Sequence, residues 1–211
     1  FIQGRPNDRV GIVLYAGESY TKTPITSDKS IVLGALNDVK FSEVLENGTA
    51  IGMGLATSVN RLKDSKALSK VIILLTDGVN NSGTIDPKLA SELAVEYGIK
   101  TYTIGIGSNG MALSPIGIKS NGQFQYGNQK VEIDEDLLKQ IATATGGQYF
   151  RATNNQKLEA IYEEINKLEK TEVEEFKFYN YKELFRSLVL AALGLIVVEV
   201  LLRFTIFRSF V

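Results

Sequence analysis

Apolar residues follow two different periods along the chain, and the alternation of these periods predicts alternating strands and helices. Residues 10–15, 71–75 and 100–106 are predicted to form strands, and the continuous aliphatic run at 71–75 is typical of the centre of a buried parallel sheet. Between and after these runs, apolar residues recur at helical spacing. This spacing predicts five helices, at residues 28–39, 49–62, 87–97, 135–145 and 155–170.

The predicted helices carry recognisable caps and inward faces. Asp28, after Ser27, and Asp134 precede helical segments and are expected to cap them, because Asp accepts hydrogen bonds from the first free N–H groups of a helix. The apolar faces expected to point inward are Ile31, Leu33, Leu36 and Val39 in the first helix, and Leu158, Ile161, Ile165 and Leu168 in the last.

Strands separated by helices indicate the α/β class, with a doubly wound, mostly parallel sheet flanked by helices. A polar ribbon at residues 19–26, with Pro24, is expected at one edge of the sheet, and residues 148–152 are expected to form a short edge strand. Residues 107–129 are rich in Gly, Asn, Ser and Gln, which indicates a long surface loop or a small hairpin insertion.

The character of the chain changes after Lys170. Residues 1–170 form the predicted α/β domain, residues 171–183 a juxtamembrane segment rich in aromatic side chains, and residues 208–211 a tail. Residues 184–207 are apolar enough, and longer than the roughly 20 residues needed, to form a transmembrane helix. The alternative is a buried helix of a larger soluble protein.

Two charged residues lie inside this predicted transmembrane helix. Glu199 and Arg203 are four positions apart in the favourable order, so we expect an ion pair near a membrane interface. Arg203 and Arg208 place this end in the cytoplasm and the α/β domain outside it by the positive-inside tendency. Basic residues on the other flank, Lys177, Lys182 and Arg186, oppose that orientation.

The first residues have the pattern of a helix end. Phe1 to Gly4 are typical of a last helical turn closed by glycine, and Pro6 to Asp8 form a turn before the first strand. We therefore expect a strand and most of a helix upstream of Phe1.

Composition limits the chemistry that the chain can perform. The 211 residues carry a formal net charge of −1, so no basic surface points to nucleic acid. The chain has no Cys and no His, which excludes disulfides, thiol nucleophiles, histidine-based triads and His- or Cys-ligated zinc. A metal ion would have to be held by oxygen, which favours Mg²⁺, Mn²⁺ or Ca²⁺.

Asp77 is the most specific candidate for such chemistry. It follows the strand at residues 71–75, at the carboxyl edge where doubly wound sheets place their ligand sites. Thr49 begins a helix after a glycine-containing loop, so its hydroxyl could point to the same edge. Together they form a partial oxygen shell for a hard cation.

Two other motifs have simpler explanations. Gly105, Gly107 and Gly110 match a dinucleotide-binding glycine pattern, but no helix opens there and no acid follows at the required distance. Glu132, Asp134, Glu135 and Asp136 cluster at a helix N-terminus, where capping explains them better than a catalytic dyad does.

From Gly4 to about Leu168 the sequence resembles the von Willebrand factor type A (VWA) domain. In detail it is similar to the bacterial membrane-anchored, aerotolerance-operon (BatA/BatB-type) branch, whose members are associated with MoxR-type ATPases. The matching stretches are RPNDRVGIVLYAGESYTKTPITSD, ENGTAIGMGLATSVNRLKDSKALSKVIILLTDGVNNSG, YTIGIGSNG, VEIDEDLLKQIATATGGQYFRATN and LEAIYEEINKLEK, with EVLLRFTIFR at the end.

This resemblance implies a metal-ion-dependent adhesion site, in which a D-x-S-x-S motif, a Thr and a later Asp hold the cation. Thr49 and Asp77 match the last two elements, and magnesium is the expected ion, with manganese or calcium as alternatives. The D-x-S-x-S motif is absent, since Asp28-Lys29-Ser30 continues with Ile31-Val32, so the site is expected to be incomplete in this chain. Asn47, Gly48, Asn80 and Asn81 are expected to form the polar rim of the ligand-binding position.

The resemblance implies a membrane-anchored binding module and not an enzyme. An acidic side chain of a protein partner would complete the cation's coordination, and other membrane VWA proteins or a MoxR-type ATPase are the expected partners. The expected location is the bacterial inner membrane, with the domain on the periplasmic side. The alternatives are a metal-dependent hydrolase or phosphatase using Asp77, and a structural subunit with an inactive metal site.

Overall fold

The computed structural model describes residues 1–40, 47–107, 110–118, 124–170 and 185–205. The chain divides into two compact units, Phe1–Val173 and Glu174–Val211, which are described separately below. The predicted segments 171–183 and 208–211 lie outside the described residues.

Three parallel strands form the ladder that carries the candidate site. β4 (Lys100–Ile106) lies between β3 (Val71–Thr76) and β7 (Tyr149–Ala152). Aliphatic residues in β3 alternate between buried and half-buried, as expected when both sheet faces are covered by helices. The apolar run predicted a central position for this strand, yet β3 is the edge of its own ladder.

A second, antiparallel ladder joins β1 (Val10–Tyr15) to β2 (Ser19–Thr26) through a short turn. Its register shifts between Val10 and Val13, which marks a bulge in the pairing. No ladder joins β1 to β3 within the described part of the chain.

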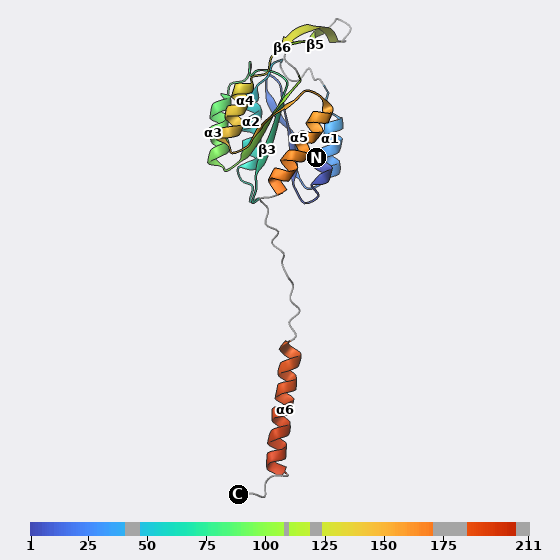
Figure 1. Ribbon diagram of the computed structural model, residues 1–211, viewed down its shortest axis with the longest axis vertical. Coiled ribbons are helices and arrows are strands. Elements are labelled where there is room, and N and C mark those ends of the chain that lie inside the picture. The colour runs from blue at the N-terminus through green and yellow to red at the C-terminus, as the bar shows by residue number, and fades with distance from the viewer. Residues whose placement is uncertain (41–46, 108–109, 119–123, 171–184, 206–211) are drawn as a thin grey trace. The chain divides into compact units, whose positions relative to one another are not determined.

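Five helices within the described part of the first unit surround these strands. Figure 1 shows α2, α3 and α4 on one side of the strands and α1 and α5 on the other, the doubly wound arrangement that the sequence predicts. The helix bounds are α1 Lys29–Asn37, α2 Ile51–Leu62, α3 Pro87–Glu96, α4 Glu135–Ala144 and α5 Asn155–Lys170. A short 3₁₀ turn, η1 (Ile2–Gly4), precedes β1.

Each face of the sheet has its own apolar core. Leu55 of α2, Ile72 of β3 and Leu138 of α4 belong to the first core, and Ile104 of β4 and Ile165 of α5 belong to the second. Burial of these side chains stabilises the domain by about 1.5–3 kcal/mol each. The predicted α/β class with a mostly parallel sheet between helices is confirmed.

Residues 107–129 were open to two interpretations, a loop or a hairpin. The structure contains a hairpin of β5 (Gly110–Ile118) and β6 (Phe124–Val131), paired antiparallel. The glycine pattern at Gly105, Gly107 and Gly110 therefore leads into a strand and not into the helix that a dinucleotide site requires.

The inward face predicted for α1 is wrong at three of its four residues, and the fourth, Leu33, is half-buried. Ile31, Leu36 and Val39 are 54%, 41% and 41% exposed, and Val32 is the buried residue of this helix. Apolar residues lie on several sides of such a short helix, so their spacing does not select one face. The Asp28 cap is confirmed, because its carboxylate accepts hydrogen bonds from the backbone N–H groups of Ser30 and Ile31.

The inward face of α5 is correct at Leu158, Ile161 and Ile165 but wrong at Leu168, which is 37% exposed. The neighbouring Glu169 is buried instead, at 4% exposure. Its carboxylate accepts hydrogen bonds from Tyr102 Oη at 2.6 Å and Ser69 Oγ at 3.1 Å, and it pairs with Lys100 Nζ at 3.1 Å. These partners compensate the loss of hydration that a buried carboxylate suffers.

The second unit contains α6 (Phe185–Thr205), close to the predicted transmembrane segment. Within the described residues, Leu188–Thr205 is the one stretch of helix long and apolar enough to cross a membrane by length and composition. Glu199 and Arg203 both lie on α6, and no ion pair joins them among the residues that the structure describes, so their pairing stays a prediction.

Candidate functional site

Asp77 and Thr49 come together at the carboxyl edge of the parallel strands. Asp77 is the first residue after β3 and is exposed, and Thr49 lies two residues before α2. A Cβ atom placed on Gly78 would lie only 3.0 Å from Thr49 Oγ1. The Thr49 hydroxyl therefore packs against Gly78, the residue next to Asp77, and glycine at position 78 permits this approach. The role of Thr49 and Asp77 as metal ligands stays a prediction.

Asn81 ties the Thr49 backbone to the loop that follows Asp77. The Thr49 N–H donates to Asn81 Oδ1 at 2.8 Å, and the Asn81 N–H donates to the Thr49 carbonyl at 3.1 Å. These two reciprocal hydrogen bonds join segments 32 positions apart in the chain. The loop before α2 and the loop after β3 thereby hold each other in place.

Asn80 caps the start of α2 from the same loop. Its Oδ1 accepts a hydrogen bond from the Ile51 N–H at 2.8 Å, while the N-cap residue Ala50 has no side chain able to do so. The side-chain oxygens of Asn80 and Asn81 are thus bonded to backbone N–H groups. The structure shows that both residues position the site, and their direct contact with a ligand stays a prediction.

Gly48 and Asn47 lie at the outer edge of the site. Gly48 has φ +139°, and a Cβ atom there would lie 2.0 Å from Ser82 Oγ, so a larger residue is excluded for both conformational and steric reasons. Asn47 is exposed. The role of these two residues as part of a ligand-binding rim stays a prediction.

Tyr15 is a residue of the site that the sequence interpretation missed. Its hydroxyl donates to the Leu75 carbonyl at 2.5 Å, and the next residue, Ala16, accepts a hydrogen bond at 2.6 Å from the Ala50 N–H. Burial raises the pKa of Tyr15 to about 12, a hydrogen bond with Thr76 lowers it, and the charge of Asp77 raises it. A tyrosine at the end of a strand preceding the Thr49 loop was the available signal.

This raised pKa predicts a pH dependence of stability. The unfolded chain loses the Tyr15 proton near pH 10.0 and the folded chain near 12, so the free energy of unfolding is expected to fall by about 2–3 kcal/mol across this interval. Tyr15→Phe should remove this part of the decrease, measured by chemical denaturation at several pH values. Tyr97→Phe, at a 37% exposed position, is the control and should leave the decrease unchanged. Equal pH profiles for both variants would contradict the prediction.

The acid cluster before α4 has structural roles. Asp134 Oδ1 accepts a hydrogen bond from the Leu137 N–H at 3.0 Å and so caps the helix. Glu135 pairs with Arg151 Nη1 at 2.9 Å. These contacts support the capping interpretation over a catalytic dyad.

The donor set at the carboxyl edge fits a hard cation in part. A threonine hydroxyl and a carboxylate are ligands that Mg²⁺ and Ca²⁺ accept, and the chain has no His or Cys to supply an imidazole or thiolate ligand. Among the described residues, no group of three or more acidic side chains is able to hold a metal. A cation held by Thr49 and Asp77 therefore needs further ligands, from water, from other polypeptide segments or from a partner.

Comparisons with known proteins agree with this geometry. The family model of the von Willebrand factor type A domain matches residues 1–164. An uncharacterized protein of Borreliella burgdorferi is 31% identical over 198 residues, and the chain spans 94% of its own length but 58% of that relative.

Comparison with solved structures identifies proteins of the same fold. BatB from Bacteroides thetaiotaomicron is similar with a TM-score of 0.65 and 27% identity, covering 80% of this chain and 83% of that one. An aerotolerance-related membrane protein from Bacteroides fragilis gives 0.62 and 28%, covering 79% and 83%. Proximal thread matrix protein 1 of the mussel byssus, with a zinc-occupied MIDAS motif, gives 0.59 and 25%, covering 80% and 38%.

Proposed function

The chain belongs to the von Willebrand factor type A domain family, and from this premise we propose that it is a membrane-anchored binding module with a cation-dependent site at Thr49 and Asp77. The observation that carries the proposal is the approach of the Thr49 hydroxyl to the residue beside Asp77, held by the reciprocal hydrogen bonds of Asn81. A carboxylate from a protein partner would complete the coordination of the cation. Recognition of this kind requires an open coordination position and no protein nucleophile.

Magnesium is the ion that we propose for this site, because its ligands are all oxygen and one of them is a carboxylate. Thr49 and Asp77 would be its protein ligands, and the cation would supply the positive charge that attracts the partner's acidic side chain. Asn80 and Asn81 would keep the two loops at a fixed separation while the partner binds.

Catalysis is a weaker explanation of the same residues. A hydrolase or phosphatase would need a second acid or a lysine near Asp77. Lys70 lies at the opposite end of β3, where its ammonium group contacts the Tyr97 carbonyl. The hydroxyl and carboxylate pair is therefore better explained by cation binding than by turnover.

The proposed setting is the bacterial inner membrane, with the α/β domain on the periplasmic side and partners that include other membrane VWA proteins or a MoxR-type ATPase. One apolar helix and the similarity to an aerotolerance-related membrane protein support membrane association. The Cys-free sequence provides a direct test of orientation. Ser82→Cys should react with a membrane-impermeant maleimide in spheroplasts, and reaction only after lysis would reverse the proposed orientation.

Replacing Asp77 with asparagine tests the cation site. The Mg²⁺ dissociation constant of the full chain in detergent micelles, measured from the amide shifts of Thr49 and Gly78, should rise by at least about tenfold, because the site loses its carboxylate. Asp64→Asn, an equal charge change at an exposed turn after α2, is the control and should have no effect.

The partner arm of this test uses complexes captured from solubilised membranes. Complexes of the original chain should dissociate in EDTA and re-form with excess Mg²⁺, and Asp77→Asn should fail to capture the same partner. Capture that survives both EDTA and Asp77→Asn would show that the interaction does not use a bridging cation.

A further inference from the structure

An exposed leucine lies at the amino edge of the sheet, where the parallel strands begin. Leu68 belongs to the loop at residues 63–70, which connects the end of α2 to the start of β3, and its side chain is 89% exposed. Even on the apolar helix α6, the most exposed of the described leucines, Leu188 and Leu195, reach only 71%. Single exposed leucines are common on protein surfaces, so the meaning of this one depends on its surroundings.

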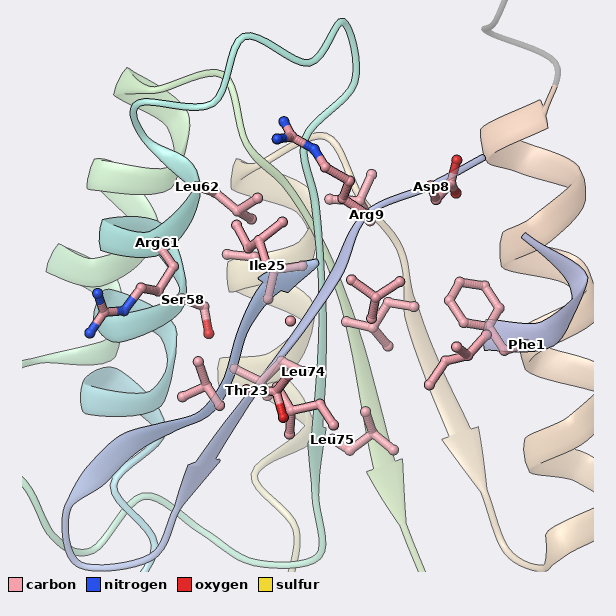
Figure 2. Close-up of a pocket in the computed structure, with 18 of the residues that line it drawn as sticks. Phe1, Asp8, Arg9, Thr23, Ile25, Ser58, Arg61, Leu62, Leu74 and Leu75 are labelled. Atoms are coloured by element: carbon pink, nitrogen blue, oxygen red, sulfur yellow. The ribbon is translucent and has the colours of Figure 1, made fainter. Parts of the chain in front are cut away.

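Hydrogen bonds hold the loop 63–70 in a defined shape. The Ser65 N–H donates to the Leu62 carbonyl at 2.9 Å, and Ser65 Oγ accepts from the Ala67 N–H at 3.3 Å. Arg9, just before β1, donates to the same Ser65 hydroxyl at 3.4 Å, and Figure 2 shows its guanidinium group beside the connection that follows Leu62. The loop is therefore fixed while the side chain of Leu68 stays in solvent.

Basic side chains surround Leu68. The loop 63–70 contains three lysines and one aspartate, and Arg9 adds an exposed guanidinium group. Within the described part of the chain, Lys63 and Lys66 have no ion-pair partner. An exposed apolar side chain among cations suits the surface of an anionic bilayer, because the apolar group enters the headgroup boundary while the cations meet the phosphates.

The chain leaves the domain at this same edge. Glu169, in the last turn of α5, accepts a hydrogen bond from Ser69 Oγ of the loop at 3.1 Å and pairs at 3.1 Å with Lys100, the first residue of β4. Fourteen residues then separate Lys170 from α6. A segment of this length spans at most about 50 Å. Insertion of α6 in a membrane would therefore keep lipid headgroups at a high effective concentration around the loop.

We propose that the loop 63–70 docks on a bilayer that contains anionic phospholipids, with Leu68 among the headgroups and the lysines of the loop and Arg9 against the phosphates. This inference rests on the proposed membrane anchorage but not on the cation site. Asp77 follows the other end of β3, which is six residues long and therefore spans about 20 Å. Docking of the amino edge would direct Asp77 away from the bilayer, so a protein partner would reach it from the aqueous side.

Fluorescence quenching in reconstituted membranes tests the proposal. The chain has no Cys, so one introduced cysteine can carry a bimane label. Ala67→Cys, at an exposed position, leaves Leu68 in place. The full chain is reconstituted in phosphatidylcholine vesicles that contain nitroxide-labelled lipid, with or without phosphatidylglycerol. In the anionic vesicles the nitroxide lipid should lower the fluorescence at position 67 by at least about half.

Two other labelled positions serve as controls. Leu89→Cys, at a 53% exposed position in the first turn of α3 on the carboxyl edge, should not be quenched. Leu195→Cys, on α6, should be quenched in all these vesicles and reports the anchorage itself. An unquenched label at position 195 would overturn the anchorage and this inference together. Quenching at 195 but not at 67 would overturn this inference alone.

Substitutions in the loop separate its apolar and basic contributions. In the Ala67→Cys chain, Leu68→Ser removes the apolar group, and Lys63→Gln with Lys66→Gln removes two cations. Each change should reduce the quenching in anionic vesicles by about half or more. Lys88→Gln, at an exposed position on α3, is the control and should leave the quenching unchanged.

Three further outcomes would overturn the proposal. Equal quenching at position 67 in neutral and anionic vesicles would show that anionic headgroups are not the ligand. Equal quenching at positions 67 and 89 would show that the domain touches the bilayer without a preferred face. A label at position 67 that neither aqueous iodide nor nitroxide lipid quenches would show that polypeptide, and not lipid, covers the loop.

Discussion

Replacing Gly52 with alanine is expected to lower the free energy of unfolding by about 3 kcal/mol. Gly52 lies in the first turn of α2, and a Cβ atom there would lie 2.0 Å from the Ile85 carbonyl oxygen and 2.9 Å from Pro87 N. Both contacts are with backbone atoms, which no side-chain rotation can relieve. Either α2 or the segment before α3 must move.

That movement should also reach the candidate site. The first turn of α2 carries the Ile51 N–H bonded to Asn80, and the preceding Thr49 is bonded to Asn81, so a shift of α2 separates both pairs. We therefore expect Gly52→Ala to weaken Mg²⁺ binding as well as stability. Chemical denaturation followed by tyrosine fluorescence, together with Mg²⁺ titration, measures the two effects.

Gly34→Ala is the matched control for this substitution. Gly34 is also in the interior of a helix, but no atom lies within 4 Å of its added Cβ. Alanine should raise the free energy of unfolding there by about 0.5–1 kcal/mol, through its higher helix propensity. A similar destabilisation by both substitutions would show that the close contact of Gly52 is not the cause.

Replacing Glu169 with alanine is the second large effect, with an expected loss of about 3 kcal/mol in the free energy of unfolding. The substitution removes the carboxylate that accepts a hydrogen bond from Tyr102 Oη at 2.6 Å and pairs with Lys100 Nζ at 3.1 Å. Glu164→Ala, at an exposed position of the same helix, is the control and should change stability by less than about 0.5 kcal/mol. Equal losses for the two variants would contradict a stabilising role of this buried network.

The same network predicts a dependence on acid. Burial opposes ionisation of Glu169, but hydrogen bonds from Tyr102, Lys100 and Ser69 and the charge of Lys100 outweigh it, so the pKa of Glu169 is lowered from 4.5. A lowered pKa stabilises the folded chain above pH 4.5, and this contribution is lost as the pH falls through the folded value. Glu169→Gln should therefore flatten the stability profile below pH 4.5, measured by chemical denaturation.

Local patterns in the sequence were sufficient for most of the elements and for the nearness of the Thr49 loop to the end of β3. Caps such as Asp28 and Asp134 act on backbone groups two or three positions away, so their effect can be read from a short segment. Thr49 and Asp77 were predicted to converge because the carboxyl ends of parallel strands and the loops beside them share one edge. A parallel sheet places these two segments at one edge whatever the details of their side chains.

Contacts between distant segments were not available from the sequence. Glu169 is buried and Leu168 exposed because Lys100, Tyr102 and Ser69 surround the carboxylate, and these residues lie at least 67 positions away. Hydrophobic spacing predicts which residues share a helix face. It does not predict that polar residues from distant segments will surround a charged neighbour such as Glu169. The error at α1 has the same origin, since three apolar neighbours in a row leave its buried face to be chosen by packing.

The sequence by itself determined the α/β class, the order of the elements, the apolar C-terminal helix and the position of Asp77 at the carboxyl edge of the strands, because each depends on local periodicity or on the shared edge of a sheet. Only the tertiary structure decided that Asn80 and Asn81 bind backbone groups of the Thr49 loop, that Tyr15 reaches the Leu75 carbonyl, and that β1 and β3 belong to separate ladders. Hydrogen bonds and gaps of this kind arise between residues far apart in the chain. Their geometry is set when the separate elements pack, and no local preference of the backbone encodes it.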